Sequence, residues 1–148
     1  MACANYWTTP FQVGSHHLAR GFVDAGWTVG FVSDPISPLH LLGHARKELA
    51  NRFQLYRGGG LWDLDQKVWA YVPGAVATPR NEPVLRSHAL ERGWASLTWP
   101  SVEKVVRNHG FGTVDLLYCD SPKHLSWLSH VARGRTVFRV ADNTSGFG

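Results

Sequence analysis

The sequence predicts an α/β domain in which helices cover both faces of a mainly parallel β-sheet. Short apolar segments that suit buried strands alternate along the chain with amphipathic segments of helical period. Gly, Pro, Asn and Asp residues separate these segments. The chain has 148 residues, of which 44% are hydrophobic and 18% charged, enough for one domain with its own core. This alternation is typical of a doubly wound fold, and we treat residues 1–148 as a single domain.

The first part of the chain predicts a strand, a helix and a second strand. Residues 1–5 are short and apolar, and residues 6–13 form a loop that contains a proline. A helix is expected to follow, with Ser15 as its N-cap. Gly26 stands where this helix must end, because glycine tolerates the left-handed conformation common there. Residues 27–33 then read as a buried strand.

The remaining elements follow from the same patterns. Helices are expected over residues 43–56, 84–98 and 101–110, and another begins at Pro122 and is closed by Gly134. Strands are expected over residues 68–72, 114–119 and 136–141.

Charge and cysteine usage narrow the class of protein. The net charge is +4, but the basic residues are scattered and form no run, which argues against a nucleic-acid partner. A mildly basic surface suits anionic ligands and an anionic membrane face equally well. Cys3 and Cys119 lie in predicted strands, where they serve as small core residues. No signal peptide or transmembrane run is visible, so we expect a cytoplasmic protein.

Polar residues follow three predicted strands and mark the candidate site. These positions are the loop that leads into Gly14, Ser15, His16 and His17, the pair Asp120 and Ser121, and the pair Asp142 and Asn143. In a doubly wound sheet such loops converge on one crevice. A carboxylate there can orient a hydroxyl or act as a base, whereas Asp120 is equally suited to capping the next helix. His16 and His17 could bind an anion, or simply form a solvated pair.

Several common ligand motifs are missing. Of the G-x-G-x-x-G dinucleotide motif only Gly14 is present, so a tightly bound dinucleotide is not expected. His40 and His44 have the spacing of a zinc-binding pair, but no third ligand accompanies them. We therefore expect neither a metal nor a cofactor.

Four motifs resemble the N-terminal half of GT-B glycosyltransferases that act on bacterial cell-surface polysaccharides. The stretch from Gly14 to Ser33 resembles the first helix and second strand of that half. Three further motifs are similar to its later strands: Val68-Trp-Ala-Tyr-Val-Pro-Gly, Leu117-Tyr-Cys-Asp-Ser-Pro and Arg139-Val-Ala-Asp-Asn. The resemblance implies a Rossmann-like half that binds the acceptor, while a second half, absent from this chain, holds the nucleotide sugar.

The resemblance also implies roles for the candidate residues. Gly14 and its neighbours would line a cleft between the two halves, with Asp120 and Asp142 at its rim. We expect His16 or His17, and next Asp142, to act on the acceptor hydroxyl. Substrate binding would involve Gly14, Ser15, Asp120, Ser121 and Asn143. The partners would be a nucleotide-sugar donor and a glycan or lipid-linked acceptor, with peripheral association at the inner face of the membrane.

Two alternatives stay open on sequence grounds. The chain could be a non-catalytic α/β ligand-binding module, or a half-domain similar to sugar-nucleotide epimerases. A regulator-like module should carry an acidic cluster after its first strand, where this chain has Asn5-Tyr-Trp. Because the chain ends just after a predicted strand, we expect more protein to follow Gly148.

Overall fold

The described residues fold around a six-stranded sheet, which confirms the predicted α/β class. The computed structural model describes residues 1–38, 46–76 and 93–139. Six strands form the sheet: β1 (Ala2–Cys3), β2 (Val29–Ser33), β3 (Leu61–Asp63), β4 (Val68–Tyr71), β5 (Thr113–Cys119) and β6 (Ala132–Phe138). Their order is β3-β4-β2-β1-β5-β6, and every neighbouring pair is parallel except β3 with β4.

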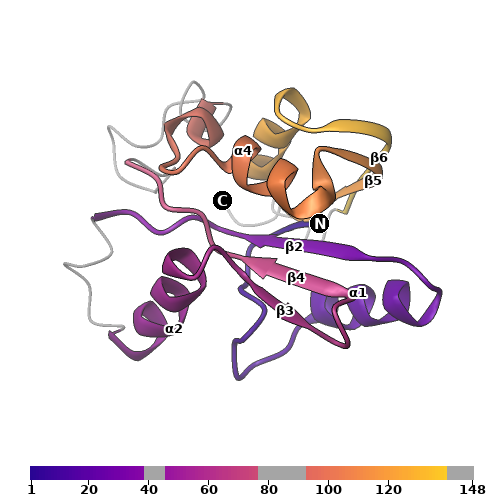
Figure 1. The fold of residues 1–148 in the computed structure, drawn as a ribbon, viewed down its shortest axis with the longest axis horizontal. Helices are drawn as coiled ribbons and strands as arrows, with labels where there is room; N and C mark the ends of the chain where they lie inside the picture. The colour runs from indigo at the N-terminus through magenta and orange to yellow at the C-terminus, as the bar shows by residue number, and fades with distance from the viewer. Residues whose placement is uncertain (39–45, 77–92, 140–148) are drawn as a thin grey trace, which may run out of the picture.

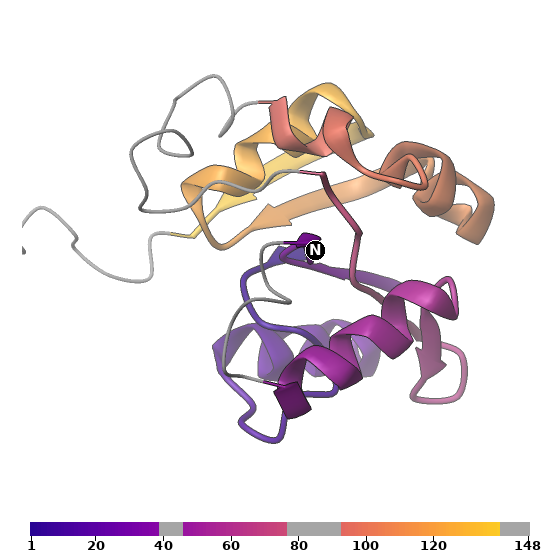
Figure 2. The same cartoon turned by 90° about the vertical axis from the view of Figure 1, so that its left-hand side faces the viewer.

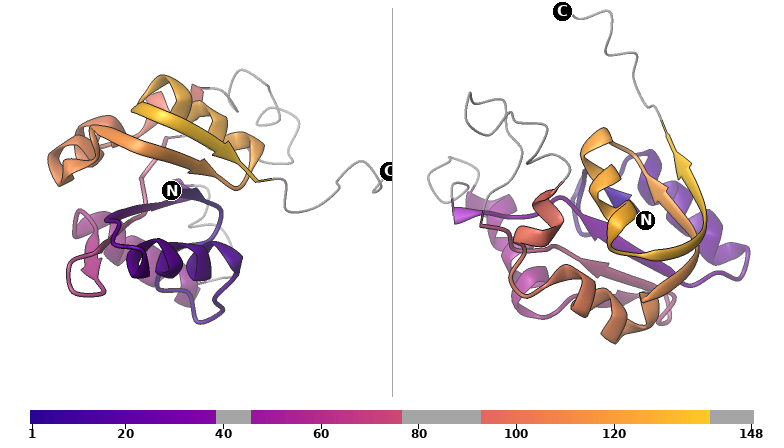
Figure 3. Two further views of the ribbon diagram at one scale, coloured as in Figure 1. Left: turned by 90° about the vertical axis from the view of Figure 1, so that its right-hand side faces the viewer. Right: turned by 90° about the horizontal axis from the view of Figure 1, so that it is seen from above.

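The helical segments lie on both faces of the sheet (Figure 1). They are α1 (Gly14–Asp24), α2 (Arg46–Arg57), α4 (Val102–Val106), the short turns η2 (Trp94–Leu97) and η3 (Arg107–Phe111), and the 3₁₀ segment η4 (Pro122–Ser129). Figure 2 shows α2 on the side of the sheet opposite η2 and η4, and Figure 3 shows α1 on the same side as α2.

Alternation along the strands divides the core between the two faces. Ala2, Trp69 and Cys119 point to the face covered by η2, α4 and η4, where Trp94, Val106 and Trp127 pack on them. Their immediate neighbours Cys3, Ala70 and Tyr118 point to the face covered by α1. The strands are apolar on both sides because a parallel sheet is buried on both sides.

Helix α1 ends as the sequence predicts but begins differently. Gly26 has φ 89°, and its N–H donates to Val23 O while the Trp27 N–H donates to Phe22 O, the pattern of a Schellman cap. The predicted N-cap at Ser15 is wrong, because the helix begins at Gly14 with Val13 as its cap. The His16 ring, at the third helical position, accepts the Val13 N–H at 3.2 Å, as the Glu or Gln of a capping box does.

The last described strand corrects a second boundary. The helix expected to reach Gly134 ends at Ser129, and β6 begins at Ala132 rather than at residue 136. Gly134 lies inside the strand, where an added Cβ would stand 3.0 Å from Asp115 O on β5. Close contact with β5 therefore explains this glycine better than a helix end does. The short antiparallel strand β3 was not predicted, and most of the helix expected over residues 84–98 lies outside the described residues.

The strand order places a topological switch point beside β1. From β1 the chain builds outward through β2 and β4, and it then returns to the other side of β1 to add β5 and β6. Loops leaving the carboxyl ends of β1 and β5 therefore diverge to opposite faces. In open α/β sheets ligands bind in the crevice outside such a point.

Candidate functional site

The candidate site lies at the carboxyl edge of the sheet, around the ends of β1, β2, β5 and β6. Asp120 follows β5 directly, and its two carboxylate oxygens accept the Ala4 N–H at 3.0 and 3.2 Å. In return the Asp120 N–H donates to Ala2 O at 3.2 Å. Asp120 thus fastens the start of the loop after β1 to the end of β5. The alternative role of Asp120, as the N-cap of the next helix, is not observed, because the N-cap of η4 is Ser121, which makes no side-chain capping hydrogen bond.

A buried histidine joins the ends of two strands that do not neighbour one another. His124, on η4, is 1% exposed; its Nε2 lies 2.8 Å from Asp34 Oδ1 and its Nδ1 lies 3.1 Å from Asp120 Oδ1. Asp34 follows β2, and its second oxygen contacts Lys123 Nζ. The cluster Asp34–Lys123–His124–Asp120 therefore bridges β2 and β5 across the end of β1.

The charges of this cluster shift two pKa values in opposite directions. Burial works against the charged imidazole, but the hydrogen bonds and charges of Asp120 and Asp34 together raise the pKa of His124 above its usual 6.5. Burial also opposes the Asp34 carboxylate, yet His124 and Lys123 lower the pKa of that group below 3.8. Near neutral pH the carboxylates therefore favour a protonated His124, which suits an ionic clamp better than an acid–base catalyst.

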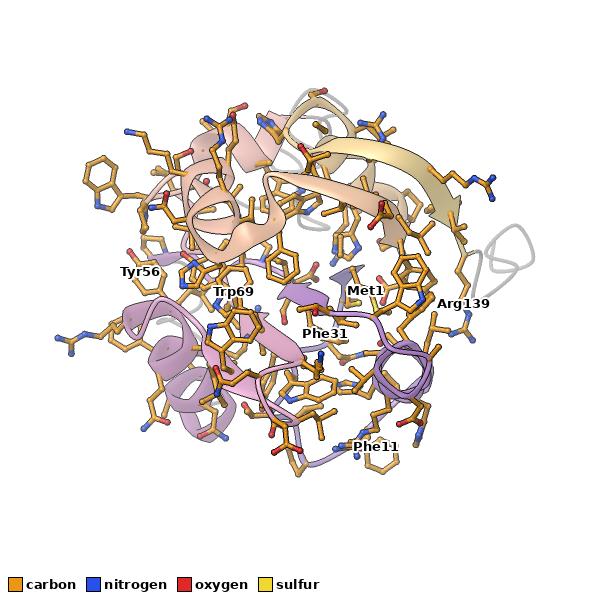
Figure 4. The ribbon with its side chains drawn as sticks, turned by 45° about the vertical axis from the view of Figure 1, so that its right-hand side comes forward. Met1, Phe11, Phe31, Tyr56, Trp69 and Arg139 are labelled. Atoms are coloured by element: carbon orange, nitrogen blue, oxygen red, sulfur yellow. The ribbon has the colours of Figure 1, made fainter. Side chains whose placement is uncertain are left out.

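An arginine lies over the start of α1. Arg139 follows β6 and is labelled in Figure 4. A Cβ added to Gly14 would stand 2.7 Å from Arg139 Nη1. The main chain of Arg139 is held by its N–H, which donates to Cys119 O at 2.9 Å. Glycine at position 14 thus leaves room for the guanidinium at the positive end of the α1 dipole. Burial raises the pKa of the nearby Tyr118, and the charge of Arg139 opposes that shift.

The two histidines at the start of α1 have different surroundings. His16 is fully buried; its Nδ1 accepts the Val13 N–H, its Nε2 lies 3.0 Å from Tyr6 O, and its ring stacks on Trp7. Both ring nitrogens are therefore occupied by the main chain, a geometry that supports a structural role. His17 is exposed, and Ser15 is buried beside it. The structure brings Gly14, Asp120 and Ser121 to one edge, while Asp142 and Asn143 lie outside the described residues.

Sequence reasoning missed Asp34, Lys123 and His124. A usable signal was present, because Asp34 follows its strand as Asp120 follows β5, and His124 stands four residues after Asp120. Within residues 1–38, 46–76 and 93–139, no group of His, Cys, Asp and Glu is arranged to hold a metal ion. Over the same residues, no helix has the length and apolar character needed to cross a membrane.

Comparison with known proteins gives a single family. Residues 1–148, the whole chain, match the family described as glucuronosyltransferase GumK, N-terminal domain. No curated relative and no solved structure shows significant similarity to the chain. The family match agrees with the Rossmann-like topology and with the resemblance to the N-terminal half of GT-B enzymes. This chain therefore belongs to the family of N-terminal domains of the glucuronosyltransferase GumK.

Proposed function

We propose that this chain is the acceptor-binding half of a glycosyltransferase that moves glucuronic acid from a nucleotide-activated donor to a glycan or lipid-linked acceptor. The family match supports the reaction class. The observation that carries the acceptor role is the Arg139 guanidinium over Gly14, beside the loop that Asp120 holds. The donor half, and the second wall of the cleft, belong outside residues 1–148 in this proposal.

The electrostatics of this edge suit an anionic acceptor. The N-terminus of α1 carries a partial positive charge, and Arg139 adds a full one. A phosphate group of a lipid-linked acceptor would find both charges on one side of the crevice. Peripheral association with the inner face of the membrane, and a cytoplasmic site of reaction, belong to this proposal because such an acceptor is anchored in the lipid.

The proposed chemistry needs one base. We assign it to Asp142, which comes four residues after the end of β6. Its carboxylate would take the proton of the acceptor hydroxyl as that oxygen bonds to the anomeric carbon and the nucleotide leaves with the bonding electron pair. His17, Ser121 and Asn143 are proposed to position the acceptor. The enclosed geometry of His16 supports a role in shaping the start of α1 instead.

Titration of this chain with each substrate, followed by amide NMR, tests the proposal. A lipid-linked oligosaccharide acceptor should shift the amide signals of Gly14, Asp120 and Arg139, whereas nucleotide-activated glucuronic acid alone should leave them unchanged. Binding of the donor without binding of the acceptor would contradict the proposal. Binding of a dinucleotide would favour the epimerase-like alternative, because that chemistry needs a nicotinamide cofactor.

A further inference from the structure

A cavity of about 650 Å³ opens at the opposite, amino-terminal edge of the sheet. Met1 and Ala2 form one end of it, β2 and β5 form its two sides, and Trp27, Phe111 and Trp127 contribute to its lining. Figure 4 places Met1 near the centre of the molecule, between the two parts of the sheet. This cavity is remote from the Asp120 edge, because β2 and β5 enter it by their first residues and reach Asp34 and Asp120 by their last.

The strand register explains the shape of the cavity. Strand β1 has two residues, and Ala2 pairs with Val32 on one side and Cys119 on the other. β5 begins at Thr113, so its residues 113–117 extend beyond the position opposite Met1. β6 pairs with this part of β5 on one side, and no described strand pairs with it on the other. Val29 and Gly30 extend in the same way on β2. The cavity therefore has the width of one strand, and the main-chain edges of β2 and β5 form its two sides.

Main-chain groups on these edges of β2 and β5 point into the cavity. The Asp120 N–H donates to Ala2 O, and residues of a strand alternate in direction, so Val114 and Leu116 direct their N–H and C=O groups toward the cavity. On the β2 side, the amino group of Met1 donates to Gly30 O at 2.5 Å. That amino group is buried, and burial lowers its pKa because a charge there lacks solvation. A peptide N–H in the same place would make the same hydrogen bond without a buried charge.

We propose that this cavity is a slot for an extended apolar peptide segment that is joined to Met1 and continues β1 in its amino-terminal direction, parallel to β2 and β5. Five residues, at about 3.3 Å each, would match residues 113–117 of β5. The segment should be apolar at every position, because a central strand of a parallel sheet is covered on both faces. Ala2 and its neighbours already show this, since Ala2 packs toward Trp127 and Met1 packs toward Phe22.

Chains with a five-residue extension placed directly before Met1 test the proposal. One variant carries Val-Ile-Val-Leu-Val, and its matched control carries Val-Ile-Pro-Leu-Val, since proline cannot donate to the ladder and is excluded from central strands. The first extension should raise the Tm by about 5 °C or more over the control. Amide exchange at Val114 and Leu116 should slow about tenfold or more, while Leu117, which faces β6, should change less.

Three results would overturn the proposal. The Tm of the two extended chains could rise equally, which would indicate non-specific apolar contact. The exchange rates of Val114 and Leu116 could stay as they are in the chain without an extension. Size-exclusion chromatography could show a dimer, with slowed amide exchange at Val114 and Leu116 only in that dimer. This result would identify a second copy of the chain as the occupant.

Discussion

His124 Nε2 lies 2.8 Å from Asp34 Oδ1, although the two residues are 90 positions apart in the chain. This contact ties η4, which follows β5, to the end of β2, with the end of β1 between them. The contact therefore holds the segments that follow β2 and β5 in fixed positions relative to each other. A loop that must present polar groups to a substrate benefits from such support, because a small displacement weakens both binding and catalysis.

Stability should depend on pH through His124. Its folded pKa is raised, so its contribution is complete below about pH 6.5 and is lost as the pH rises through the folded value. The folded pKa of Asp34 is lowered, so its contribution is present above about pH 3.8 and is lost in more acidic solution. Urea unfolding of the wild type and of H124Q at a series of pH values gives the difference between their free energies of unfolding. This difference should shrink as the pH rises from about 6 to about 9. A constant difference over that range would contradict a charged His124.

Removal of the Asp120 carboxylate should weaken the fold as well as the site. D120A leaves the Ala4 N–H without its acceptor and removes the carboxylate that lies 3.1 Å from His124 Nδ1, so we expect the free energy of unfolding to fall by about 2–4 kcal/mol. NMR titration should also show a lower pKa for His124, because Asp120 helps to raise it. D115A is the matched control on the exposed part of β5 and should change stability by less than about 0.5 kcal/mol. Equal effects of the two substitutions would argue against a stabilising role for the Asp34–Lys123–His124–Asp120 cluster.

The adjacent histidines of α1 provide a direct comparison. H16A removes a buried ring that bonds to Val13 and Tyr6, so the free energy of unfolding should fall by about 2–4 kcal/mol. H17A alters an exposed side chain and should stay within about 0.5 kcal/mol of the wild type. Chemical denaturation measures both. A stable H16A chain that nevertheless loses acceptor binding would show that His16 acts on the substrate.

Two glycines of α1 separate an effect on the site from an effect on the helix. In G14A the new methyl group would meet Arg139 Nη1 at 2.7 Å, so the guanidinium must move and acceptor binding should weaken about tenfold. At Gly21 nothing lies within 4 Å of an added Cβ, and G21A should stabilise the helix by up to about 1 kcal/mol without loss of binding. Isothermal titration of both variants with the acceptor makes the comparison. Unchanged binding in G14A would remove Arg139 from the proposed acceptor site.

The local features of the fold could be predicted well where one short segment decides them. Gly26 ends α1 because the Schellman cap needs a positive φ within a few residues of the helix. Boundaries that depend on a distant partner were missed. Gly134 looked like a helix end, but its lack of a side chain accommodates the Asp115 carbonyl on the neighbouring strand.

The sequence by itself determined the alternation of strands and helices, and with it the parallel sheet and its carboxyl edge, because apolar periodicity is a local property. It also placed Gly14, Asp120 and Ser121 at that edge. Only the tertiary structure decided that His16 is enclosed by the main chain and that His124 joins Asp34 to Asp120. His124 and Asp34 are 90 positions apart, and the order of the strands, which no single segment encodes, brings them together. His16 contacts Tyr6, ten positions earlier, through the folding of the loop between them.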